Sequence, residues 1–216
     1  IDFGQPANVQ VRNSSSGQIF LGSDYDSAGG FLTLTSGNGV TIQDLSANDT
    51  VTIDLGAGAL TVTGAATLVD SNINITANGG ISFSSTIGTS GSASDLTLNS
   101  GTGGAISVAG NIASGGAGLA GLTITQSNGA TFSGEVNVVN DSSDVITITD
   151  TEDGADIVFA GVVTSDSMEF GQSGYDLVFL SNVNLQDPVV FDNTGTLTLG
   201  DNSSDDFSFA GGVTES

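Results

Sequence analysis

Apolar and polar residues alternate over short segments of this chain, and the segments recur at nearly regular intervals. The segment 122–136 (LTITQSNGATFSGEV) shows the unit: an alternating strand is followed by a turn at Asn128-Gly129 and a second strand through Phe132. A small pair, Ser133-Gly134, then bends the chain before Val136. Alternation with a period of two predicts β-strands that bury one face.

The same unit returns along the whole chain. The apolar residues that come directly before each bend are Leu21, Ile42, Val62, Phe83, Val108, Phe132, Phe159, Phe179 and Phe209. They lie about 23 residues apart on average, a period typical of solenoids. With three short strands in each period, the chain is expected to form one all-β domain over 1–216, a parallel three-sided β-helix of about nine coils. The residues before the bends are expected to stack in one core ladder.

The turns between the first and second strands of a unit leave one alternative open. Asn38-Gly39, Asn78-Gly79 and Asn128-Gly129 also suit the type I′ turns of antiparallel hairpins. Hairpins would pair the strands in twos, but each unit has three strands, so we favour the coil. The segment 184–195 departs from the repeat and contains Pro188, which cannot donate to a ladder, so it is expected to be an irregular insertion.

Composition limits the functions that the chain can serve. It has 24 acidic residues against a single basic one, Arg12, and a formal net charge of −23. Binding to nucleic acid and to anionic membranes requires basic residues, so both are disfavoured. Histidine and cysteine are missing, which removes Ser–His and Cys–His nucleophiles. Paired carboxylates would lack basic partners, so we expect no enzyme.

Nothing in the sequence predicts insertion into a membrane. No run of about 18 apolar residues is present, as a spanning helix would require. The chain starts at Ile1 without an initiating methionine, and we interpret it as a processed product or a fragment.

The repeated units, with alternating apolar and threonine positions followed by glycine-bounded strands, occur at 32–39, 96–110, 122–134, 146–161 and 197–211. In these units the chain resembles the β-strand-repeat and filamentous haemagglutinin-like segments of bacterial surface and secreted proteins. The resemblance implies a right-handed parallel β-helix at an extracellular or cell-surface location. It implies no catalytic residue.

Acidic residues precede many of the expected strands. Those at the expected corners are Asp49, Asp95, Asp144, Asp166, Asp176 and Asp206. Such residues commonly form Asx turns, but stacked corners could also gather carboxylates that hold Ca²⁺. The densest group consists of Asp150, Glu152, Asp153 and Asp156. It lacks the full spacing of an EF-hand loop, and we keep it as a calcium hypothesis.

Two further features suggest how the chain interacts. Threonines in T-x-T pairs (Thr123 with Thr125, Thr147 with Thr149) predict flat rows of hydroxyls, which ordinary cross-strand pairing also explains. The repeat continues to both termini, so we expect uncovered strand edges there.

Apolar residues near the two termini are therefore candidate assembly residues: Phe3, Ile19, Phe207 and Val213. We expect a non-enzymatic extracellular structural protein, a segment of a filament, stalk or surface matrix that assembles end to end. The alternative is an adhesin segment that binds a receptor or glycan, and an ice-binding face is less favoured.

Overall fold

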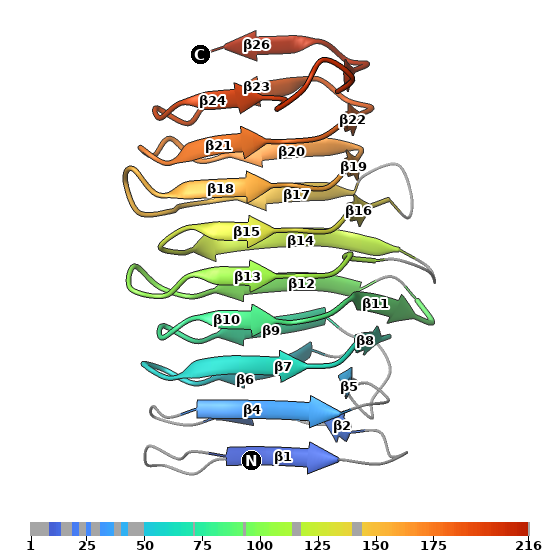
Figure 1. Cartoon of the computed structure of the whole chain (residues 1–216), viewed down its shortest axis with the longest axis vertical. Coiled ribbons are helices and arrows are strands. Elements are labelled where there is room, and N and C mark those ends of the chain that lie inside the picture. Colours follow the sequence, from blue (N-terminus) through green and yellow to red (C-terminus); the bar gives the residue numbers. More distant parts are fainter. Residues whose placement is uncertain are drawn as a thin grey trace.

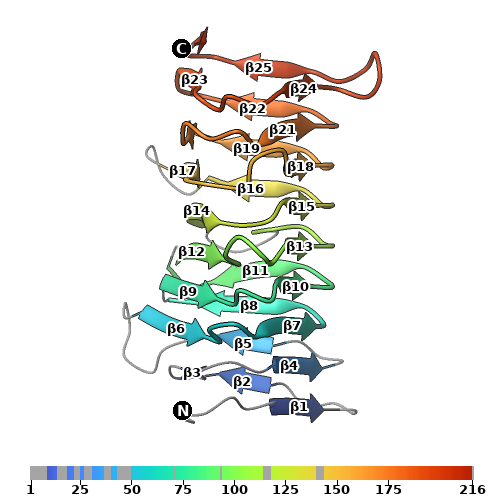
Figure 2. The same ribbon diagram turned by 90° about the vertical axis from the view of Figure 1, so that its left-hand side faces the viewer.

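The computed structural model describes residues 9–13, 19–21, 25–26, 31–36, 40–42, 50–70, 72–92, 94–113, 118–139 and 144–215. These residues form 26 strands and no helix. The strands stack as coils along a rod that carries the N-terminus at one end and the C-terminus at the other (Figures 1 and 2). Within this part of the chain, no helix is long and apolar enough to cross a membrane.

The first side of the rod is a nine-stranded sheet in which each strand pairs with the strand one coil away. Its strands are β1 (Val9–Asn13), β4 (Phe31–Ser36), β7 (Ala59–Thr63), β10 (Ile81–Phe83), β13 (Ile106–Val108), β15 (Ala130–Phe132), β18 (Asp156–Phe159), β21 (Asp176–Phe179) and β24 (Leu197–Leu199). All its pairings are parallel, because every coil returns to this side in the same direction.

The second side consists of two four-stranded sheets joined by single bridges from Ile112 to Ile87 and Val136. One sheet contains β2 (Ile19–Leu21), β5 (Val40–Ile42), β8 (Ala66–Val69) and β11 (Ile87–Ser90). The other contains β16 (Val136–Val138), β19 (Val163–Ser165), β22 (Val183–Leu185) and β25 (Phe207–Phe209).

The third side has a seven-stranded sheet and, beyond it, a pair of strands. The sheet contains β3 (Tyr25–Asp26), β6 (Thr50–Asp54), β9 (Asn72–Thr76), β12 (Ser94–Asn99), β14 (Leu119–Gln126), β17 (Val145–Ile148) and β20 (Ser167–Phe170). The pair is β23 (Val189–Phe191) and β26 (Val213–Glu215).

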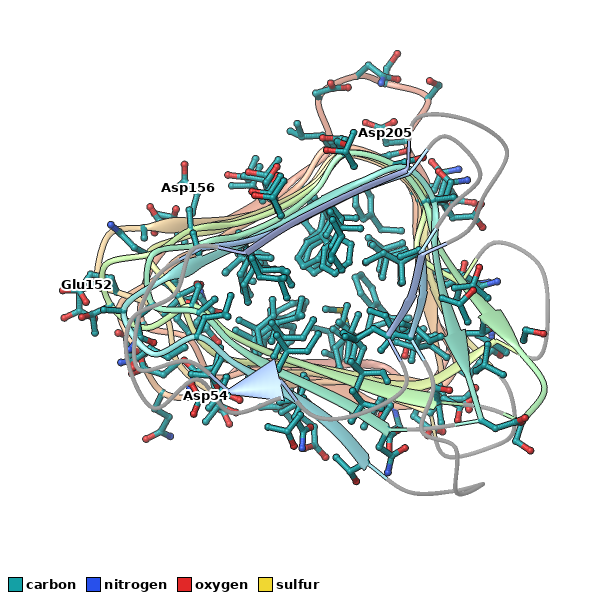
Figure 3. The ribbon with its side chains drawn as sticks, turned by 90° about the horizontal axis from the view of Figure 1, so that it is seen from below. Asp54, Glu152, Asp156 and Asp205 are labelled. Carbon is teal, nitrogen blue, oxygen red and sulfur yellow. The ribbon has the colours of Figure 1, made fainter. Side chains whose placement is uncertain are left out.

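Figure 3 views the rod from below, from the end that carries the N-terminus in Figure 1. From this end the chain passes clockwise from the first to the second to the third side while it moves away from the reader, so the coil is right-handed. The expected all-β parallel β-helix with three sides is therefore confirmed.

Alternating side chains point into the rod and fill its core. On the first side the register stacks Val62, Phe83, Val108, Phe132, Phe159 and Phe179, all of them buried. The Phe132 and Phe159 rings stack with centroids 5.1 Å apart, and the Phe159 and Phe179 rings with centroids 5.2 Å apart. Offset aromatic stacking of this kind favours the in-register alignment of neighbouring coils.

Three residues assigned to this ladder from the sequence belong to another side, and that assignment was wrong. Leu21, Ile42 and Phe209 lie on the second side, in β2, β5 and β25. The row of the first side instead continues from Val62 to Leu34 and from Phe179 to Leu199. The three sides share one alternating pattern and the coils differ in length, so alternation alone does not reveal which side a strand joins.

The segment 184–195 contains β23, whose Val189 and Phe191 are buried. The Phe191 ring stacks on Phe170 of β20, with centroids 5.1 Å apart. β23 nevertheless pairs in a sheet with β26 rather than with β20. Pro188, which has no N–H to donate, directly precedes it.

Candidate functional site

The acidic group at 150–156 lies at the corner that joins β17 on the third side to β18 on the first side. The Asp150 carboxylate accepts hydrogen bonds from the Ser173 hydroxyl (2.7 Å) and the Gln126 amide (3.3 Å). The Asp153 carboxylate accepts the backbone N–H of Gly174 at 2.8 Å. Both carboxylates therefore bind groups of neighbouring coils.

The four acidic side chains of this corner do not converge on one point. Figure 3 shows Glu152 and Asp156 pointing away from the rod in different directions. In the described part of the chain, no group of three or more acidic, histidine or cysteine side chains is arranged to hold a metal ion. Calcium binding by Asp150, Glu152, Asp153 and Asp156 therefore stays a prediction, while the bonds shown here serve to join coils.

Asn and Asp side chains at other corners make the same kind of bond between coils. In each case a side-chain oxygen accepts the backbone N–H of a residue 20 to 24 positions later: Asn72 from Asp95 (3.2 Å), Asn111 from Glu135 (3.1 Å), Asp176 from Thr196 (2.6 Å) and Asn182 from Asp206 (2.9 Å). Local Asx turns also occur, at Asp54 with Gly56 and at Asn99 with Gly101. Strands are interrupted at the corners, so backbone N–H groups there need acceptors other than a neighbouring strand. Polar side chains at the corners supply these acceptors.

A group of carboxylates lies where the second side turns into the third. Asp144 and Asp166 are only 2% and 7% exposed, and the Asp166 carboxylate accepts the backbone N–H of Asp144 at 3.2 Å. The pKa of Asp95 is raised above its ordinary value. The main cause is desolvation by burial, and the second is the negative charge of Asp144. Of these three residues, Asp166 caps a backbone N–H as expected at a corner, whereas Asp95 lies within β12. Asp49 lies outside the described residues.

The outer face of the third side carries the expected polar rows. The register places one row of outward residues in line from β6 to β20: Thr52, Asn74, Thr97, Thr123, Thr147 and Glu169. Neighbouring members are about 4.8 Å apart, the spacing of paired strands. Glu169 interrupts the hydroxyl and amide groups at the C-terminal end of the row.

The C-terminal coil presents apolar residues of a different kind. Leu197, Leu199 and Val213 are 39%, 43% and 53% exposed. Their register partners one coil earlier, Leu177, Phe179 and Val189, are almost fully buried. The last coil thus continues the inward-facing pattern of the core, but no described coil covers it.

The strands of this coil are also the last described members of their sheets. β24 is the terminal strand of the nine-stranded sheet, β25 is terminal in its four-stranded sheet, and β26 is the outer member of the last pair. Figures 1 and 2 show these strands at the C-terminal end of the rod, with no described element beyond them. Strand edges with free N–H and C=O groups readily pair with another chain.

Of the assembly residues expected from the sequence, Phe207 and Val213 lie in this C-terminal coil. Ile19 is in β2, at the opposite end of the rod, and Phe3 lies outside the described residues. Sequence reasoning did not include Leu197 and Leu199 in this set. Their position in the last repeat unit, 197–211, could have identified them. They were overlooked because Phe209, rather than Leu199, was assigned to the first-side ladder in this unit.

Comparisons of the chain with protein-family models, with curated proteins and with solved structures gave no match.

Proposed function

We propose that this chain is a non-enzymatic extracellular structural protein, a rod-like segment of a filament, stalk or surface matrix that joins its neighbour coil on coil. The observation that supports the proposal is the apolar face of the last described coil, where Leu197, Leu199 and Val213 are exposed and a further coil could pack. A coil of a second copy would bury these side chains and pair the strand edges of this coil. The extracellular location is supported by the resemblance of the repeat units to bacterial surface proteins.

Stacking of this kind leads to extended assemblies. The C-terminal face of one copy would meet the N-terminal face of the next, so the contact is heterologous and leaves a free face at each end. Every strand pairing among the described residues is parallel, and the joint would repeat that geometry between copies. Filaments are the expected product.

The test is a pair of substitutions on β24. Leu199→Asp places a carboxylate on the uncovered apolar face and is expected to abolish assembly, measured by sedimentation velocity and negative-stain microscopy. Thr198→Asp adds the same charge to the same strand on its exposed outer face and is expected to leave assembly intact. Circular dichroism checks that the inner coils of both variants stay folded.

Two results would contradict the proposal. One is a parent chain that stays monomeric at high protein concentration, and the other is a Leu199→Asp variant that assembles as the parent does. Either result would favour the alternative of an adhesin segment.

The flat polar row on the third side supports that alternative, because hydroxyl and amide groups can hydrogen-bond to a glycan or protein receptor. Replacing Thr123, at the centre of the row, by tyrosine would then abolish receptor or glycan binding without loss of the folded structure. An ice-binding face would use the same row and would be detected by ice-recrystallisation assays.

A further inference from the structure

The third side contains a seam where two neighbouring strands do not pair. β20 is the last strand of the seven-stranded sheet, and β23 pairs only with β26 among the described strands. The two strands nevertheless belong to successive coils (Figure 1), and the Phe170 and Phe191 rings stack between them with centroids 5.1 Å apart. The core is thus closed behind the seam, while the sheet in front of it is interrupted.

Backbone groups of the two strands face each other across this seam. The Ser167 N–H donates to a carbonyl of the preceding coil at 3.2 Å. Alternate residues of a parallel strand direct their backbone groups to opposite neighbours, so those of Met168 and Phe170 face β23. The Val189 N–H donates to a carbonyl of the following coil at 3.0 Å, so the backbone groups of Val190 face β20.

Pro188 explains why these groups form no ladder. By the same alternation it faces β20, but it has no N–H to donate. The Asp166 carbonyl instead accepts the N–H groups of Gln186 (3.0 Å) and Asp187 (2.8 Å), which directly precede the proline. The coils are therefore joined just before the seam and not along it.

A groove of about 440 Å³ opens outward over the seam. Ligand pockets commonly have volumes of about 300–1,000 Å³. Val190, which is 40% exposed, and Pro188 give the groove an apolar surface, and Glu169 and Asp192 add two carboxylates. Met168 lines the groove with its backbone, because its side chain is buried in the core.

The groove offers hydrogen-bond donors as well as acceptors. Asp192 lies two residues after Val190, so its N–H also faces β20. Among the described residues, neither this N–H nor that of Met168 has a backbone acceptor. The ionised carboxylates of Glu169 and Asp192 can only accept. A ligand that satisfies the groove must therefore both accept and donate hydrogen bonds.

We propose that this groove binds a neutral sugar unit of a glycan, with Glu169 and Asp192 accepting its hydroxyl groups and Val190 lying against the C–H face of its ring. Each hydroxyl both donates and accepts, so one sugar ring can serve the carboxylates and the backbone N–H groups together. The site does not depend on the end-to-end assembly proposed above. It gives the glycan-binding alternative a defined place on the third side.

Other classes of ligand fit the groove less well. An anion would be repelled by both carboxylates and by the net charge of −23. A metal ion or an ammonium group would pair with the carboxylates but leave the N–H groups of Met168 and Asp192 without acceptors. An apolar ligand would leave donors and acceptors alike unpaired.

Binding is tested on the whole chain with two kinds of probe. Methyl glycosides of neutral hexoses, followed by saturation-transfer-difference NMR, test the single sugar. A microarray of neutral, sialylated and amino-sugar glycans tests the sugar within a glycan. Neutral sugars are expected to bind in both formats.

Two substitutions locate the site. Val190→Trp fills the groove and is expected to abolish binding, whereas Val178→Trp, on the outer face of β21, is expected to leave it unchanged. Glu169→Gln keeps the size of the side chain but removes its charge, and it is expected to weaken binding roughly tenfold. Glu152→Gln removes the same charge at a different corner and is expected to have no effect. Circular dichroism checks that all four variants fold.

Three results would overturn the inference. They are a parent chain that binds no neutral sugar, a preference for amino sugars over neutral ones, and binding that is unchanged in Val190→Trp and Glu169→Gln. Thr123→Tyr adds a further check, because loss of binding there but not in Val190→Trp would assign the glycan to the polar row and also overturn the groove.

The outcome is separate from that of the proposed function. Sedimentation velocity on the same parent sample measures assembly without reference to sugar. Filaments without sugar binding would overturn the groove and leave end-to-end assembly standing. A monomeric chain whose sugar binding is lost in Val190→Trp would support the groove and contradict the assembly.

Discussion

At the residue scale, Phe132 shows what the core requires of one side chain. It is fully buried between Val108 and Phe159 of the neighbouring coils. An aspartate there would bury a charge without a basic partner, so Phe132→Asp is expected to lower the free energy of unfolding by about 4 kcal/mol or more. Phe132→Leu keeps an apolar side chain of somewhat smaller size and is expected to cost about 1 kcal/mol. Urea denaturation followed by circular dichroism measures both.

Thr131 provides the matched control, because it is the preceding residue on β15 and is exposed on the opposite face. Thr131→Asp is expected to differ from the parent by less than about 0.5 kcal/mol, as substitutions at exposed positions commonly do. Equal stability of Phe132→Asp and Thr131→Asp would mean that the inward and outward faces of β15 are assigned the wrong way round.

At the element scale, the bends between the first and second sides depend on glycines that lie against the preceding coil. A Cβ atom built on Gly134 would be 2.5 Å from the carbonyl carbon of Gly110, and one on Gly161 would be 2.3 Å from the carbonyl oxygen of Gly134. These are backbone atoms, so the bend cannot yield by a change of rotamer. Gly134→Ala is expected to lower the free energy of unfolding by about 2 kcal/mol, measured by chemical denaturation.

Gly103 supplies the comparison, since the nearest atom to its Cβ position is the Asn78 carbonyl oxygen at an ordinary 3.7 Å. Gly103→Ala is expected to change stability by less than about 1 kcal/mol, since it introduces no steric overlap. If Gly134→Ala were as stable as Gly103→Ala, close approach of the backbones would not be the reason for glycine in these bends.

At the scale of the whole molecule, the dominant feature is charge. With 24 acidic residues and one basic residue on a single rod, repulsion opposes both folding and assembly until cations screen it. We expect CaCl₂ to raise the thermal midpoint more than NaCl does at equal ionic strength, because a divalent ion interacts with several carboxylates at once. Thermal unfolding followed by circular dichroism measures the difference.

The double variant Asp150→Asn/Asp153→Asn tests whether the acidic corner is responsible. Loss of the additional effect of calcium in this variant would support the calcium hypothesis for Asp150, Glu152, Asp153 and Asp156. An equal response of the parent to the two salts would reduce the effect to general screening, and the hypothesis would then be abandoned.

The sequence by itself determined the fold class, because burial acts directly on the alternation of side chains. Period-two alternation predicts strands, and a repeat near 23 residues with small or polar corner residues predicts coils. The inward positions of Ile124, Phe132 and Val136 were all correct, since each is buried. The interpretation of corner aspartates as capping residues is confirmed for Asp166 and Asp176, whose carboxylates accept backbone N–H groups, although the sequence did not show that these bonds join successive coils.

Only the tertiary structure decided which side each strand joins and which face of the rod stays uncovered. Phe209 and Leu199 carry the same alternating signal, yet Leu199 continues the first-side row above Phe179 and Phe209 lies on the second side above Leu185. The physical reason is that inward burial fixes only the face of a strand, whereas its side depends on how the corners between coils bend. For the same reason, Leu199 reads as a core residue in the sequence, and its exposure follows only from the position of β24 at the end of the stack.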